Sequence, residues 1–364
     1  MRQQLLDHPS AELAVGARDT DPHPHTPPAT YRWSVDRVRL GIVGSGWAAR
    51  THLAVLRDEP DVAVARGEPR SGARRALARL AGLDVRTYPS HREMLDAGGL
   101  DAILTCSPPD ARGAPELDAL DLGLHLLVEK PVGLDATVPA RIGHRIHEAG
   151  VVVSVGYQWR YLDLVERARE LLVERPPQLL LGAWLGETPR ASWWVRQASS
   201  GGQVVEQATH VLDLMRLLAG EGRVVAARAA DATGRARGTA DIRDVSTAML
   251  EFDSGAIGTL ATTRLLDRGH RAGLEAFSVG RSVSLELHPH RLVVREGART
   301  IDVATDQDRL EPYRRQDRAF LDAVLGRGHD IRSPWDDAIR THALALEATR
   351  LALAGPRAVD PGAA

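Results

Sequence analysis

A lysine at the end of one apolar segment stands where it could do chemistry. Lys130 follows the strand-like run at 125–128 and Glu129, and Pro131 after it disfavours a helical conformation at the lysine. An ammonium group at the end of a buried strand can stabilise the negative charge that develops on a substrate oxygen. On its own Lys130 would as readily be a surface charge, so its interpretation depends on the residues expected around it.

A second group of polar residues follows a turn that contains Gly201 and Gly202. Glu206, His210 and Asp213 come next, at spacings of four and three residues that place them along one side of a helix. A carboxylate in such a position can orient an imidazole that acts as a general acid or base. Two other interpretations are a surface ion pair worth about 0.5 kcal/mol and a zinc site, for which we find no third ligand at a supporting spacing. We therefore predict no metal.

The elements that would position Lys130 alternate between strand-like and helical segments from residue 38 to residue 156. Strands are expected at 38–43, 62–66, 84–88, 101–106, 125–129 and 151–156, and helices at 47–57, 71–82, 91–96, 110–122 and 135–149. This alternation predicts a doubly wound α/β domain with a parallel sheet. The carboxyl ends of its strands form the edge at which ligands of such sheets bind, so Lys130 is expected at that edge.

The segments that would position His210 follow a different pattern. Helices are expected at 162–173, 203–219, 313–326 and 335–353, and strands at 179–186, 224–231, 245–252, 256–266, 275–288, 291–296 and 299–304. This predicts an α+β domain with an open, mostly antiparallel sheet. Helices on one face of that sheet would leave the other face free to pair with a second subunit, so we expect a homodimer or homotetramer. The domains are expected at 38–157 and 158–356, with a disordered tail at 1–37 and a second tail at 357–364.

A glycine-containing turn joins the first predicted strand to the first predicted helix. In the motif GxGxxA at 44–49, Gly44 permits a tight turn, Gly46 lets the backbone approach a pyrophosphate, and Ala49 lets the helix pack closely on the sheet. Glu68, at the end of the second strand, is at a distance suited to the ribose hydroxyls. The segment therefore predicts a Rossmann domain that binds a dinucleotide, NAD rather than NADP, although Arg66 and Arg70 leave NADP open. The cofactor-binding residues are predicted to be Gly44, Ser45, Gly46, Trp47, Ala48, Ala49, Glu68, Ser107, Pro108, Glu129 and Lys130.

Composition limits the classes of partner. The chain has 46 Lys and Arg against 48 Asp and Glu, so no global basic field would attract nucleic acid or an anionic membrane. The single cysteine excludes an internal disulfide, as in proteins of a reducing compartment, and we expect a cytoplasmic protein. The polar and aromatic residues Trp159, Arg160, Arg196 and Asp213 are candidates for binding a polyhydroxylated substrate, with inter-domain packing as the alternative.

These motifs together resemble one known family. The GxGxxA turn followed by His52, the Glu129-Lys130-Pro131 segment, the glycine pair with Glu206 and His210, and a closing helix at 317–324 resemble the Gfo/Idh/MocA oxidoreductases. The resemblance covers about residues 38–353. It implies a Rossmann domain, an α/β domain with an open sheet, bound NAD or NADP, and oxidation or reduction of sugars, cyclitols and related alcohols.

Two positions depart from the family pattern. Glu206 stands where the family usually has aspartate, and 110–112 reads Asp-Ala-Arg where the family often has a histidine.

The resulting hypothesis is hydride transfer between nicotinamide and a carbon that bears a hydroxyl group. His210 would exchange the hydroxyl proton, Lys130 would polarise the oxygen, and Glu206 or Asp213 would fix the imidazole tautomer. An imidazole with a pKa of about 6.5 can act in either direction near neutrality. The alternatives are a glycosidase that oxidises its sugar transiently and a non-catalytic dinucleotide-binding sensor.

Overall fold

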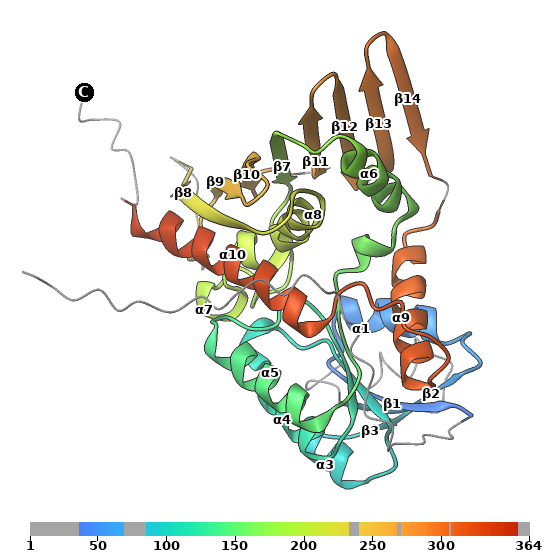
Figure 1. Ribbon diagram of the computed structural model, residues 1–364. Helices are drawn as coiled ribbons and strands as arrows, with labels where there is room; N and C mark the ends of the chain where they lie inside the picture. Colours follow the sequence, from blue (N-terminus) through green and yellow to red (C-terminus); the bar gives the residue numbers. More distant parts are fainter. Residues whose placement is uncertain are drawn as a thin grey trace, which may run out of the picture. The chain divides into compact units, whose positions relative to one another are not determined.

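The computed structural model describes residues 36–68, 85–232, 240–267, 271–287, 289–305 and 307–355 (Figure 1). The helix predicted at 71–82, the tail at 357–364 and all but the last two residues of the tail at 1–37 lie outside these ranges. Among the helices within them, none combines the length and the apolar composition that a membrane span needs.

The first sheet of the described chain has six parallel strands. These are β1 (Val38–Val43), β2 (Val62–Glu68), β3 (Arg86–Thr87), β4 (Ala102–Thr105), β5 (His125–Val128) and β6 (Val153–Val155), in the spatial order β3-β2-β1-β4-β5-β6. Every residue of β4 and β5 is buried, as expected for central strands of a parallel sheet covered on both faces. The helices that follow its strands are α1 (Trp47–Leu56), α3 (His91–Asp96), α4 (Ala114–Asp121) and α5 (Thr137–Ala149). The predicted doubly wound domain is confirmed.

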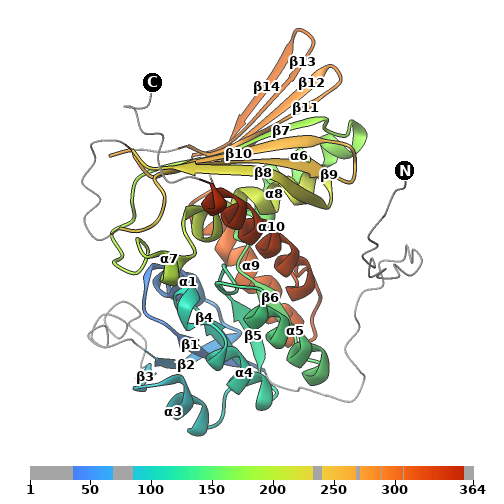
Figure 2. The same ribbon diagram turned by 90° about the vertical axis from the view of Figure 1, so that its left-hand side faces the viewer.

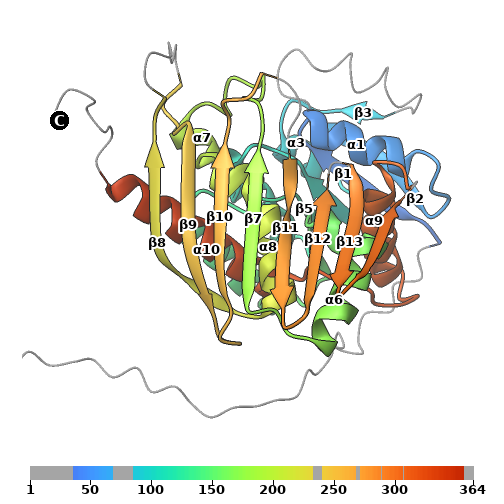
Figure 3. The same ribbon diagram turned by 90° about the horizontal axis from the view of Figure 1, so that it is seen from above.

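The second sheet has eight strands in the described chain, and Figure 3 shows them side by side. They are β7 (Leu179–Leu185), β8 (Gly222–Ala230), β9 (Val245–Phe252), β10 (Ile257–Thr263), β11 (Arg271–Ser278), β12 (Arg281–Leu287), β13 (His290–Glu296) and β14 (Arg299–Ala304). Their spatial order is β14-β13-β12-β11-β7-β10-β9-β8. Only β7 and β10 pair in parallel among these described strands, so the predicted open, mostly antiparallel sheet is confirmed.

The prediction of one long strand at 275–288 was wrong. The segment is a hairpin of β11 and β12, in which Ser278 pairs with Arg281 across the turn. Gly280 has a φ of +73°, which only glycine adopts readily, and Val279 is 76% exposed. Apolar residues alternate on both sides of the turn, so the pattern alone does not reveal the break.

Helices cover one face of the second sheet (Figure 2). The cluster of buried residues between these helices and the sheet includes side chains of α6 (Asp163–Glu174), α8 (Thr209–Ala219) and α10 (Trp335–Ala354). Gly182 lets α8 approach β7 closely, because a Cβ atom there would lie 2.8 Å from both Val211 and Met215. The sheet therefore fixes the depth of α8, which carries His210.

The place of α9 (Glu311–Val324) in the sequence suggested that it covers the second sheet, but it does not. Its residues Phe320, Leu321 and Val324 belong to the core cluster of β1, α1 and β4. The amphipathic spacing predicts a helix with one apolar face but not which sheet receives that face. This packing brings a carboxylate of the C-terminal half against the first domain.

Candidate active site

A cavity of about 1230 Å³ lies at the carboxyl edge of the parallel sheet and extends to the first turns of the helix that contains His210. The parallel-sheet domain contributes the turn at 44–48, the segment at 106–109 and Glu129 to Pro131. The second half of the chain contributes the segment at 189–194 together with Glu206, Gln207 and His210. The cavity thus brings together the two groups of residues that the sequence singled out for chemistry.

The glycine turn leaves the N-terminus of α1 open to an anionic ligand. Gly44 has a φ of +111°, and a Cβ atom there would lie 2.8 Å from the main-chain carbonyl of Cys106. Gly46 forms the N-cap of α1 without a side-chain hydrogen bond, and no acidic residue occupies the first turn. Among the described residues, no atom beyond its chain neighbours lies within 4 Å of its ideal Cβ position. Free N–H groups and a positive helix end suit a pyrophosphate, so these residues fit a dinucleotide.

Most of the predicted cofactor-binding residues line this cavity. They are Gly44, Ser45, Gly46, Trp47, Ala48, Ser107, Pro108, Glu129 and Lys130. Ala49 lies fully buried beneath the turn, where a small side chain lets α1 pack closely on the sheet. Glu68 is the last residue of β2, and its side chain lies outside what the structure describes.

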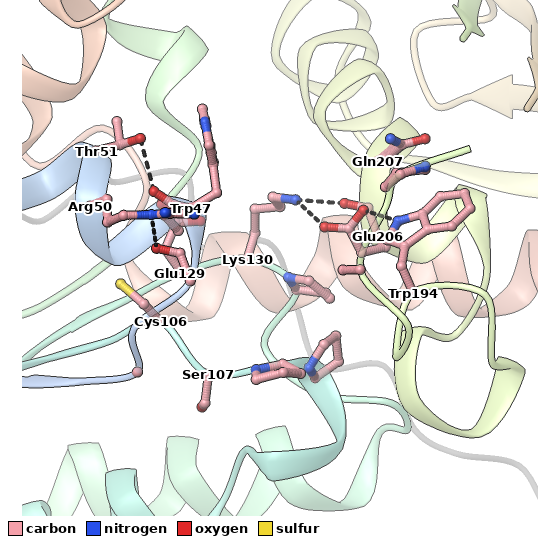
Figure 4. A pocket seen from close by; sticks show the side chains of 18 of the residues that line it. Trp47, Arg50, Thr51, Cys106, Ser107, Glu129, Lys130, Trp194, Glu206 and Gln207 are labelled. Atoms are coloured by element: carbon pink, nitrogen blue, oxygen red, sulfur yellow. Dashed lines mark hydrogen bonds and ion pairs between the residues drawn. The ribbon is translucent and has the colours of Figure 1, made fainter. Parts of the chain in front are cut away.

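Lys130 crosses the cavity to the second group (Figure 4). Its Nζ donates to the main-chain oxygen of Glu206 at 2.6 Å and to Oε1 of the same residue at 3.0 Å. The Nε1 of Trp194 donates to Oε2 of Glu206 at 2.6 Å. Both carboxylate oxygens of Glu206 thus accept hydrogen bonds, one from the lysine and one from the indole. Trp194 is a partner of this carboxylate that sequence analysis did not foresee.

A π-helical turn gives Glu206 this position. The turn η3 (Val204–Ala208) follows Gly201 and Gly202, which both have positive φ angles, and leads directly into α8. A π turn closes i→i+5 hydrogen bonds and changes the direction of its side chains relative to an α-helix. The simple i, i+4 geometry expected for Glu206 and His210 therefore does not apply.

His210 lies in an aromatic environment at the other end of the same turn. It is 5% exposed, and its ring centroid lies 4.7 Å from that of Trp159 and 6.2 Å from that of Trp184. Tyr157 contacts it edge-on at 5.8 Å. These rings fix the plane of the imidazole and exclude water from one side of it.

Of the four predicted substrate-binding residues, only Trp159 lines the cavity. Arg160 Nε and Nη2 donate to Asp213 Oδ2 and Oδ1 at 2.7 and 2.5 Å, and Asp213 Oδ1 also accepts from Thr341. Burial alone would lower the pKa of Arg160, but the attraction of Asp213 outweighs the effect of burial and raises the pKa of Arg160. Arg196 is exposed and lies outside the lining. The expected substrate contacts of Arg160 and Asp213 are replaced by a buried ion pair, and Asp213 does not serve to orient His210.

His52 forms a buried triad with two carboxylates. Its Nδ1 lies 2.7 Å from Oδ2 of Asp317 on α9, and its Nε2 lies 3.0 Å from Oε1 of Glu129. Burial alone would lower the pKa of His52, but Asp317 and Glu129 outweigh it and raise the pKa to about 10. The charged imidazole therefore holds Glu129, the residue before Lys130. The sequence contained His52 and Asp317 but gave no signal that they meet.

Two further features hold the same strand end. A Cβ atom at Gly156 would lie 2.7 Å from Oε1 of Glu129, so the carboxylate packs directly on the glycine backbone. Arg112 donates to the main-chain oxygens of Thr105 and Glu129, each at 2.7 Å. It thereby ties the ends of β4 and β5 together. Within the described ranges, no group of three His, Cys, Asp or Glu side chains could hold a metal ion.

Comparison with known proteins agrees with this arrangement. A family model described as "Oxidoreductase family, NAD-binding Rossmann fold" matches residues 38–157, and one described as "GFO/IDH/MocA C-terminal domain" matches residues 179–283. Together the two models cover more than half of the chain. The chain belongs to the Gfo/Idh/MocA oxidoreductase family. Arg112 thus stands in the region where this family often has a histidine. Its guanidinium is already hydrogen-bonded to the main chain at the ends of β4 and β5.

Individual relatives are distant in sequence. The chain is 27% identical to the rhizopine catabolism protein MocA of Rhizobium meliloti over 51% of its length and 58% of that protein. It is 24% identical to scyllo-inositol 2-dehydrogenase (NAD(+)) of Bacillus subtilis over 74% of its length and 80% of that enzyme. A solved structure of levoglucosan dehydrogenase with NADH superposes with a TM-score of 0.78 at 18% identity, covering 87% of this chain and 97% of the other, and shows the shared fold.

Proposed function

We propose that this oxidoreductase transfers a hydride between a nicotinamide dinucleotide and a hydroxyl-bearing carbon of a sugar, sugar derivative or cyclitol. The observation that carries the proposal is the single cavity that both Lys130 and His210 line, beside the open N-terminus of α1. Relatives named as inositol and levoglucosan dehydrogenases support this substrate class.

In this proposal His210, Lys130 and Glu206 have one task each. When bound, the nicotinamide ring supplies the hydride acceptor or donor. His210 accepts the hydroxyl proton in oxidation and returns it in reduction. Lys130 stabilises the negative charge on the same oxygen with the one Nζ proton that Glu206 does not accept, since the ammonium group has three donors and two are used. Glu206 holds the lysine in place.

We favour NAD over NADP as the cofactor. Glu68 is the last residue of β2, the position from which an acidic side chain hydrogen-bonds the ribose hydroxyls and repels a 2′-phosphate. Titration of purified protein with NADH and NADPH, followed by nicotinamide fluorescence, tests this choice. Tighter binding of NADPH would reject it, and Glu68→Ala should reduce the preference for NADH.

The activity is tested by nicotinamide absorbance with a panel that contains myo-inositol, scyllo-inositol, D-xylose and D-glucose. We expect NADH to form with at least one member, and His210→Ala to lower turnover by at least a hundredfold while the dissociation constant for NADH changes less than twofold. His290 also lines the cavity, so His290→Ala serves as a control for the loss of an imidazole there. Equal losses of turnover and cofactor binding in His210→Ala would reject its assignment as proton acceptor.

We also propose that the chain forms a homodimer or homotetramer through the face of the second sheet that carries no helix (Figure 2). On the central strands β7, β9 and β10, Leu181, Met249 and Ile257 are 37%, 46% and 52% exposed. A sheet face with exposed apolar side chains is suited to pairing with a second copy. Light scattering should give a multiple of the 39.5 kDa chain mass, and Met249→Glu should lower it. A monomeric parent protein would reject the proposal.

A cytoplasmic location is consistent with the single, buried cysteine, Cys106.

A further inference from the structure

Gln207 is a polar residue of the cavity that the mechanism above does not use. It is half-buried, lines the cavity, follows Glu206 directly and precedes His210 by three residues. Glu206, the residue before it, accepts a hydrogen bond from Lys130 Nζ. A substrate in this cavity can therefore contact Gln207 as well as Lys130 and His210, and Figure 4 shows Gln207 beside Glu206.

A neighbouring glutamine fixes which end of this amide faces the cavity. Gln203 Nε2 donates to the main-chain oxygen of Thr263 at 2.8 Å and to Oε1 of Gln207 at 3.1 Å. The carbonyl of Thr263 can only accept a hydrogen bond, so the NH2 group of Gln203 must face it. That same NH2 group then requires the oxygen of Gln207. The NH2 group of Gln207 makes no hydrogen bond to another described residue and is left for a ligand.

The other polar groups at this end of the cavity show what kind of substrate atom the NH2 group of Gln207 can bind. The carboxylates of Glu206 and Glu129 already accept hydrogen bonds from Lys130, Trp194 and His52. Apart from His210, which accepts the hydroxyl proton, the groups named here that are left for a substrate are therefore donors, on Lys130 and Gln207. A substrate that satisfies them must offer two acceptor oxygens close together.

We propose that Gln207 determines substrate specificity by donating a hydrogen bond to the oxygen on the carbon next to the reacting carbon. The inference rests on the proposed dehydrogenase function and narrows its substrates to compounds with oxygens on adjacent carbons, such as vicinal diols and the matching hydroxyketones. Lys130 contacts the reacting oxygen, Gln207 the neighbouring one, and Gln203 sets the direction of the donor.

The test compares substrate pairs that differ by one oxygen. D-Glucose and 2-deoxy-D-glucose form one pair, and myo-inositol and a deoxy-inositol lacking a hydroxyl beside the reacting carbon form the other. Calorimetry in the presence of NADH measures binding without turnover. In the parent protein we expect removal of the oxygen to weaken binding of at least one pair roughly five- to tenfold. In Gln207→Ala the two members of that pair should bind within about twofold of each other, because the donor is absent.

Two variants separate the donor from general effects on the site. Gln203→Met leaves Gln207 in place but removes the bond that orients it, so the discrimination should fall there as well. Gln178→Ala changes an exposed glutamine outside the cavity lining and should keep the parent ratio. Discrimination that survives in Gln207→Ala, or a parent protein that binds both members of both pairs equally or binds none, would overturn the proposal. Discrimination in binding without any NADH formation would instead count against the proposed function.

Discussion

The charged state of His52 gives a stability prediction whose sign and size follow from the structure. His52 is fully buried between Asp317 and Glu129, and its pKa is about 10 against 6.5 for the ordinary imidazole. Between these two values the folded protein holds a proton that the unfolded chain has lost. The free energy of unfolding should therefore fall by up to about 1.4 kcal/mol per pH unit as the pH rises from 6.5 towards 10. The contribution is fully present below pH 6.5 and is lost above pH 10.

Urea unfolding at pH 6.5, 8 and 9.5, followed by tryptophan fluorescence, tests this for the parent protein and for His52→Gln. Other groups also titrate at alkaline pH, so the informative quantity is the difference between the two proteins. We expect His52→Gln to cost roughly 3–5 kcal/mol at pH 6.5, because both carboxylates then lose a buried cation, and the cost should shrink as the pH rises. A cost that is the same at all three pH values would refute a charged His52.

Three further substitutions test other parts of the site. Gly44→Ala should weaken NADH binding at least tenfold, because the φ of +111° is strained for alanine and the new Cβ atom would lie 2.8 Å from a main-chain carbonyl; titration with NADH measures this. Asp213→Asn should lower the free energy of unfolding by about 3 kcal/mol, because the buried Arg160 loses its bidentate partner, and urea titration should detect the loss. Glu206→Gln should lower kcat about 10- to 100-fold with little change in NADH binding, because an amide cannot accept from both the lysine and the indole and so holds Lys130 loosely; steady-state kinetics with the substrate found in the panel measures this.

The fold could largely be predicted because its signals are local. Strand and helix periodicity, together with a glycine turn between the first strand and the first helix, predicted the parallel sheet and the cofactor edge. The hairpin around Gly280 was missed because apolar alternation continues on both sides of a tight turn. The position of α9 was missed because a helix with one apolar face fits either sheet, and the choice depends on shape complementarity between segments far apart in the sequence.

In the site, too, the features with local signals could be predicted and those that depend on distant segments could not. The residue types at 130, 206 and 210 were recognisable because each follows a local motif, and the structure places all three at one cavity. Their partners were not recognisable. The contact between Glu206 and Trp194 depends on a π turn, which a repeat of four residues does not predict. Spacing also suggested that Asp213 belonged to the site, whereas a buried arginine from another segment binds it.

The glutamate at position 206, where the family usually has aspartate, is explained by the positions of its two donors. Its carboxylate lies 3.0 Å from Lys130 Nζ and 2.6 Å from Trp194 Nε1, so it bridges groups from two separate segments. A side chain shorter by one methylene would withdraw the carboxylate by about 1.5 Å, the length of one C–C bond. At least one of the two hydrogen bonds would then exceed the range in which such bonds form. The longer acid and the indole therefore act as one unit. The π turn sets the position of the Glu206 backbone, and the indole of Trp194 fixes the position of its carboxylate. That carboxylate in turn holds Lys130 between the two domains.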